Sequence, residues 1–85
     1  MDNFIMIPIR LLESDLSNNA TLLLGIINSN TKQYGYAYGN NKYYAKLLKC
    51  STRTITNLLN ELSKSNYIKI DSPRSFKRKI YVINF

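Results

Sequence analysis

A group of short polar side chains around one arginine is the part of this sequence best suited to binding a ligand through hydrogen bonds. From Thr52 to Lys64, apolar residues recur at the spacing of one helical face, namely Ile55, Leu58, Leu59 and Leu62. The opposite face carries Thr52, Arg53, Thr56, Asn57 and Asn60. Threonine and asparagine are mediocre helix formers, so an outer face built from them costs stability without adding packing. The pattern therefore indicates that this face of the helix binds a ligand.

Hydrogen bonding to DNA bases is the chemistry that this set suits. Arginine bridges guanine, asparagine bridges adenine, and threonine donates, accepts or contacts a thymine methyl group. The segment 52–64 is thus predicted to be a recognition helix that enters the major groove. The residues expected to read bases are Arg53, Thr56, Asn57 and Asn60.

Other residues are placed to hold the phosphate backbone. Thr52, at the N-terminus of the same helix, is expected to meet a phosphate, as are Lys42 and Lys46 of the preceding helix. A second group lies near the end of the chain and comprises Arg74, Ser75, Lys77, Arg78 and Lys79. The cations of this group are expected to bind phosphates or enter a narrow minor groove, which AT-rich DNA favours, and Ser75 is expected to join them in the DNA contact. The alternative is a charged edge that only prevents strand-to-strand aggregation.

Charge is distributed unevenly along the 85 residues, whose net charge is +7. Residues 1–31 hold one cation and three acids, whereas residues 32–85 hold eleven cations and two acids. This asymmetry predicts a face directed at a polyanion. The alternative is a basic protein without such a partner.

The cysteine and histidine counts exclude several kinds of site. One cysteine, Cys50, excludes an internal disulfide, and the absence of histidine excludes histidine-based metal sites and catalytic triads. We expect no enzyme, no metal and no cofactor. The apolar stretch Phe4 to Ile9 is too short to cross a membrane and unlike a signal peptide, so a cytoplasmic protein is expected.

The elements that must position these residues follow from caps and periodicity. A short extended stretch, Phe4–Ile7, precedes a helical turn over 9–12 that Pro8 can open. Ser17 is the expected N-cap of a central helix over 18–30. Within it, Leu22 and Ile26 are expected to widen the buried stripe, and Gly25 to mark a close helix crossing.

The second half of the chain predicts a helical pair and a hairpin. Tyr36–Tyr38 alternates as a short strand, and Asn40 or Asn41 caps a helix over 42–49 with an inner side of Tyr44, Leu47 and Leu48. After the turn Lys49-Cys50-Ser51, Ser51 caps the helix over 52–64, and Asn66 suits a left-handed ending. Residues 67–70 and 79–83 alternate around turn residues, which predicts a β-hairpin.

This order of elements resembles the winged-helix family. It is most similar to the helix-turn-helix domains of replication initiators and DnaD-like proteins of plasmids and phages from low-GC Gram-positive bacteria. The matching stretches are FIMIPIRLLES, LSNNATLLLGII, GYAYGNNKYYAKLLKCSTRTITNLLNELSKSNYIKI and RKIYVI. The resemblance implies an α+β fold with three helices and a C-terminal wing. It also implies one domain over 1–85, with a helix-turn-helix over about 41–64 and a wing over about 67–84.

The chain departs from the family pattern in two places. The family often has glycine in the turn where this chain has Lys49, and a non-glycine residue in a left-handed conformation costs about 1 kcal/mol or more. Replication initiators also usually continue into a further domain, whereas this sequence stops at Phe85. We therefore expect either a piece of a longer protein or a small accessory DNA binder.

Four functional interpretations remain open from the sequence, one of them a winged helix that binds a protein partner through apolar surface and leaves the segment 52–64 unengaged. The first is specific binding of duplex DNA at a replication or conjugative-transfer origin, with recruitment of larger replication or transfer proteins. A transcriptional regulator is the second, because the same fold serves both uses. The third is a single-stranded nucleic acid or RNA binder that uses tyrosines for stacking, among them Tyr36, Tyr38, Tyr43 and Tyr44. Nothing resembles a coiled-coil seam, so a dimer would use ordinary surface or form on repeated DNA sites.

Overall fold

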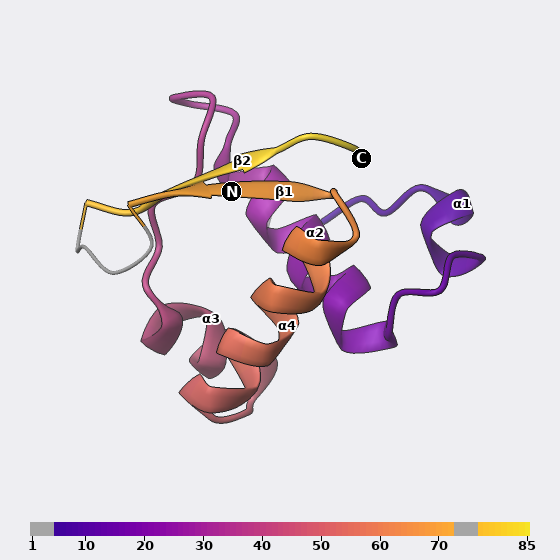
Figure 1. Ribbon diagram of the computed structural model, residues 1–85, viewed down its shortest axis with the longest axis horizontal. Helices are drawn as coiled ribbons and strands as arrows, with labels where there is room; N and C mark the ends of the chain where they lie inside the picture. Colours follow the sequence, from indigo (N-terminus) through magenta and orange to yellow (C-terminus); the bar gives the residue numbers. More distant parts are fainter. Residues whose placement is uncertain (1–4, 73–76) are drawn as a thin grey trace.

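Four helices and a two-stranded antiparallel sheet make up the fold in the computed structural model, which describes residues 5–72 and 77–85 (Figure 1). The helices are α1 (Ile9–Leu12), α2 (Asn18–Asn30), α3 (Asn41–Leu48) and α4 (Thr52–Lys64). The strands are β1 (Ile68–Asp71) and β2 (Lys79–Val82). The predicted α+β fold class, with a helix-turn-helix followed by a hairpin, is confirmed.

Each of the three longer helices begins at a side-chain cap. The oxygen atoms of Ser17, Asn40 and Ser51 each accept a hydrogen bond from the backbone N–H three residues later, at 3.2, 2.9 and 3.1 Å. Such caps satisfy backbone donors that have no partner within the helix. The capping residues explain why the starts of α2 and α4 were predicted correctly. The helix α3 begins and ends one residue earlier than predicted.

The helices α3 and α4 end in the same way. Lys49 and Asn66 adopt the left-handed conformation, with φ of 56° and 63°. In both cases the N–H of the next residue donates to the carbonyl five positions earlier, at 3.0 Å. This arrangement satisfies carbonyls at a helix end and reverses the chain sharply. The lysine in the turn therefore takes the place that glycine usually fills, as the departure from the family pattern required.

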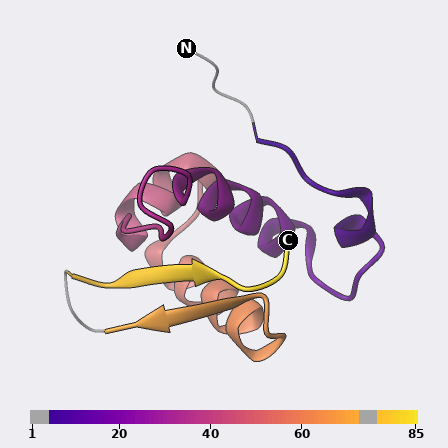
Figure 2. The ribbon, with the colours of Figure 1, turned by 90° about the horizontal axis from the view of Figure 1, so that it is seen from above.

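The core lies between α2, α4 and the inner side of the hairpin. Figure 2 shows α2 beside β2 and α4 beside β1, in agreement with the contacts between these elements. The stripe of α4 predicted from the sequence is buried, since Ile55, Leu58, Leu59 and Leu62 are at most 7% exposed. Thr21, whose burial was not predicted, donates its hydroxyl hydrogen to the carbonyl of Ser17 at 3.1 Å.

The sheet is smaller than the sequence suggested. Ile68 pairs with Val82 and Ile70 with Ile80, so these apolar residues share the inner face. The short strand expected at Tyr36–Tyr38 is a single β-bridge, in which Ala37 and Ile80 exchange two hydrogen bonds of 2.8 Å. The expected extended stretch begins outside the described residues at Phe4, and its described part, residues 5–7, forms no strand.

Two predictions of burial were wrong. Leu22 is 40% exposed because it lies on the far side of α2 from the buried residues Leu24 and Ile27. Leu47 is 49% exposed because α3 turns Tyr44 and Ala45 inward, which leaves Leu47 at the edge of the buried arc.

The role expected for Gly25 also needs correction. A Cβ atom there would lie 3.0 Å from Cδ1 of Ile5 and 3.1 Å from Cγ1 of Ile7. The close approach at Gly25 is therefore made by the N-terminal segment, whose side chains cross α2, and not by another helix.

Candidate nucleic-acid interface

The outer face of α4 is exposed to solvent. Thr52, Arg53, Thr56, Asn57 and Asn60 are all exposed, whereas the opposite side of the helix is packed into the core. The cap at Ser51 fixes where the helix starts, and the buried stripe fixes its rotation. The polar groups of the predicted recognition helix are thus held on a rigid element in one orientation.

Thr56 has less hydrogen-bonding capacity left than its neighbours on this face. Its hydroxyl donates to the carbonyl of Thr52 at 3.2 Å and accepts from Nδ2 of Asn41 at 3.1 Å. A threonine hydroxyl has one hydrogen to donate and two lone pairs. One lone pair and the methyl group remain for a ligand, so a contact of Thr56 with a thymine methyl fits better than donation to a base.

Arg78 lies elsewhere than expected for a cation at the surface of the wing. Its guanidinium is half-buried and donates from Nη1 to Oδ1 of Asn41 at 2.8 Å and from Nη2 to the carbonyl of Gly39 at 2.6 Å. Burial lowers the pKa of this group from its ordinary value. Arg78 therefore has a structural role, because its side chain ties the residue before β2 to the start of α3.

Together these bonds form a chain across three elements. Arg78, which directly precedes β2, bonds Asn41 of α3, and Asn41 bonds Thr56 of α4. We call this chain the Arg78–Asn41–Thr56 relay. From the sequence, Asn41 was predicted only as a candidate cap. The sequence feature that could have indicated its role is the doublet Asn40-Asn41. One asparagine is enough to cap the helix, so the second is available for a contact with residues far away in the sequence.

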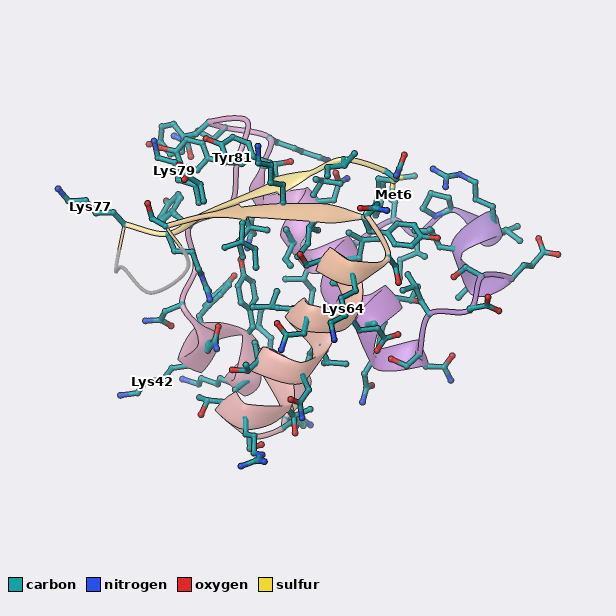
Figure 3. The ribbon with its side chains drawn as sticks, in the orientation of Figure 1. Met6, Lys42, Lys64, Lys77, Lys79 and Tyr81 are labelled. Carbon is teal, nitrogen blue, oxygen red and sulfur yellow. The ribbon has the colours of Figure 1, made fainter. Side chains whose placement is uncertain are left out.

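The remaining predicted phosphate ligands lie on two elements. Lys42 and Lys46 are exposed on α3, and Lys77 is exposed before β2; Lys42 and Lys77 both extend away from the body of the molecule in Figure 3. Lys79 is half-buried, with its Nζ atom 4.9 Å from the ring centroid of Tyr36. Arg74 and Ser75 lie outside the described residues.

Acidic groups are kept away from the exposed faces of α3 and α4. No acid occurs in residues 16–60, and the one acid of α4, Glu61, faces α2. Its carboxylate accepts from the N–H of Ser17 at 2.7 Å and from the hydroxyl of Ser17 at 2.9 Å. The helical pair therefore presents cations and neutral polar groups, which suits a polyanion.

The fold and this exposed helix define a winged helix-turn-helix: a capped pair of helices, a tight turn and a two-stranded hairpin. The chain belongs to the helix-turn-helix domain family, which matches residues 14–68. Membership of this family indicates binding of double-stranded DNA. None of the curated proteins and none of the solved structures matches the chain.

Other kinds of site are not found in the part of the chain that the structure describes. Within residues 5–72 and 77–85, no group of three or more His, Cys, Asp or Glu residues gathers around a common point. Over the same residues, no helix has the length and apolar character needed to cross a membrane.

Proposed function

We propose that this chain binds a specific duplex DNA sequence, without catalytic activity, as a single DNA-binding domain in the cytoplasm. In this proposal it is an accessory or initiator factor of a plasmid or phage, and it marks an origin of replication or conjugative transfer. The resemblance to the helix-turn-helix domains of replication initiators supports this task. Larger replication or transfer proteins would then join it there, and further copies would bind repeated sites.

One observation carries the proposal that the binding is specific. Arg53, Asn57 and Asn60 are exposed on a helix whose other side is locked into the core. Arginine and asparagine side chains can make two hydrogen bonds to the edge of one base, and such pairs distinguish the base pairs in the major groove. Their contribution to specificity depends on a helix that holds them in a fixed orientation. A helix that served only for solubility would have no need of this set.

The cations around α4 support a contact with the backbone beside the groove. Lys42 and Lys46 lie on α3, which packs against α4, and Lys77 extends from the start of the second arm of the hairpin. Contacts to phosphate position a protein on the duplex, while contacts to bases select the sequence. A wing cation that enters the minor groove would favour AT-rich flanks, where that groove is narrow.

The direct test begins with a site selected from a random duplex library. Arg53→Ala and Asn57→Ala should each weaken binding to that site by about 1–3 kcal/mol and leave binding to unrelated duplex much less affected. Arg10→Ala and Asn19→Ala remove the same residue types from exposed positions on α1 and α2, and should leave both affinities unchanged. Equal specificity in all four variants would show that α4 does not read the sequence.

The biological task is tested with the same Arg53→Ala variant. The selected sequence should lie at the origin of a plasmid or phage, and the variant should reduce replication or transfer of that element while the protein level stays normal. Selected sites at promoters, with a change in transcription and none in replication or transfer, would instead establish a regulator.

A further inference from the structure

Four tyrosines gather on the side of the hairpin that faces away from α4. The rings of Tyr34, Tyr36 and Tyr38 lie with centroids 5.8–6.4 Å apart, and Tyr81 of β2 lies 5.9 Å from Tyr36. We call this group the tyrosine surface. It joins the loop after α2 to the second strand, so residues far apart in the sequence form it together.

These rings are not required to seal the core. Ala37 and Ile80 lie beneath them and are 0% exposed, whereas Tyr34, Tyr38 and Tyr81 are 54%, 61% and 36% exposed. Rings that remain this open offer their faces and edges to a ligand. Exposed aromatic groups in contact with one another are the usual platform for stacking of bases.

The direction of the tyrosine surface follows from the strand register. Lys69 lies opposite Tyr81, and residues directly opposite each other in an antiparallel pair share a face. Because Ile68 and Ile80 face the core, Lys69 and Tyr81 face outward. Figure 3 shows Tyr81 and Lys79 on the upper side of the hairpin, with α4 below it. A ligand here would therefore not compete for the outer face of α4.

The charge around the tyrosine surface is mainly positive. Lys79 lies over the ring of Tyr36, Lys69 shares the outer face of the hairpin, and Lys32 lies in the same loop as the tyrosines. Asp71, opposite Lys79, is the acid on this face of the strands. Rings flanked by more cations than acids favour a polyanion with stackable groups over an apolar or basic protein surface.

A pocket of about 460 Å³ lies next to the same loop. Tyr38 and Tyr43 form part of its wall, and Lys32, Asn30 and Gln33 contribute a cation and two amides. Amide side chains both donate and accept, so they can pair with the edge of a base. Since Tyr38 belongs to both, the pocket extends the tyrosine surface.

We infer that the tyrosine surface and this pocket bind single-stranded nucleic acid, with bases stacked on Tyr34 and Tyr38 and phosphates near Lys32, Lys69 and Lys79. This site is separate from the duplex site proposed on α4. The assignment differs in part from the one suggested by the sequence. Tyr44 is fully buried, and Tyr43, whose ring centroid lies 5.2 Å from that of Tyr44, belongs to the pocket and not to the group of four rings.

The test measures binding of a fluorescein-labelled oligothymidine by anisotropy. Wild type should bind it more tightly than an abasic strand of the same length and charge. Stacking of one base contributes roughly a factor of 5 to 150 in affinity, so Tyr34→Ala/Tyr38→Ala should weaken oligothymidine binding at least about 25-fold. Tyr34→Phe/Tyr38→Phe keeps both rings and should bind almost as tightly as wild type.

Arg53→Ala separates this inference from the proposed function. It should lose the selected duplex site and keep oligothymidine, whereas the tyrosine-to-alanine variant should show the opposite result. Equal binding of oligothymidine and the abasic strand by wild type would overturn the inference, and this comparison decides even if the double alanine variant folds poorly. Unchanged oligothymidine affinity in a folded double alanine variant would also overturn it, and the surface would then suit a protein partner.

Discussion

Neighbouring residues of α4 have opposite environments. Leu59 is 4% exposed and belongs to the core, while Asn60, one residue later, is exposed on the outer face. One step along a helix turns the side chain by about 100°. The helix can therefore serve stability and recognition at adjacent positions, and substitutions should separate the two.

Leu59→Ala should lower the free energy of unfolding by about 2–5 kcal/mol, because it leaves a cavity among packed side chains. Asn60→Ala should change it by less than about 0.5 kcal/mol, as is usual for exposed positions. Thermal or denaturant unfolding of both variants measures the difference. Similar losses in the two would mean that Asn60 has a structural role that its exposure does not reveal.

The burial of a single residue could be predicted from the sequence where the periodicity of its own helix determines which side faces the core. The buried stripe of α4 was predicted correctly because it covers about two turns within a helix of 13 residues. Leu47 was placed wrongly because α3 has only eight residues, too few to fix the centre of the buried arc. For Arg78 the deciding neighbours are Asn41 and Gly39, 37 and 39 residues away, and no local pattern reports such a contact.

Between elements, the Arg78–Asn41–Thr56 relay is the feature with the clearest consequence. Its bonds of 2.8 and 3.1 Å connect the hairpin to α3 and α3 to α4. A guanidinium that donates to an amide oxygen and a carbonyl at once has a fixed position, which a single flexible ammonium does not reproduce. Arg78 should therefore contribute to the stability of the fold through its two hydrogen bonds more than through its positive charge.

Arg78→Ala should destabilise the protein by about 1–3 kcal/mol, because it leaves Asn41 and the carbonyl of Gly39 without their donor. Arg78→Lys should recover little of this loss, since one ammonium cannot replace the two-pronged donor. Denaturant unfolding measures both. The matched control is Arg53→Ala, which removes an exposed arginine and should cost less than about 0.5 kcal/mol. Full stability in Arg78→Lys would show that charge alone is needed there.

The helices and the hairpin were predicted correctly at the level of elements, whereas the short strand predicted at Tyr36–Tyr38 is a single β-bridge. Ser17 and Ser51 identify helix starts directly, and turn residues bound both arms of the hairpin. Pairing at Ala37 depends on how close the loop comes to β2, and only one bridge forms. The roles predicted for Lys42, Lys46 and the other DNA ligands remain predictions, because a fold shows exposure and not the bound partner.

For the whole molecule, the uneven charge of the sequence has a spatial counterpart. Among the described residues, the acids Glu13 and Asp15 follow α1, whereas most of the cations lie on or next to α3, α4 and the two strands. An approaching duplex would meet the positive part first. Attraction to a polyanion releases counterions, so the affinity should depend steeply on salt.

Lys42→Ala/Lys46→Ala should flatten the dependence of log affinity on log salt by about 1.8, because each lost phosphate contact removes about 0.9. The fold should be unaffected, since both side chains are exposed. Anisotropy titrations with duplex over a range of salt give the slope. Arg10→Ala, at α1, serves as the control and should keep the wild-type slope. A wild-type slope in the double variant would exclude α3 from the backbone contact.

The Arg78–Asn41–Thr56 relay also affects how the protein would respond to the mechanical state of its DNA. If α4 lies in the major groove and the hairpin lies on the adjacent minor groove, the relay holds the two at a fixed separation. The angular spacing of the two grooves changes with helical twist. A protein that holds its two DNA-contacting elements at a fixed separation would then bind best at one particular value of the helical twist. Its occupancy of a closed circular plasmid should vary with supercoiling, even though the base sequence stays the same.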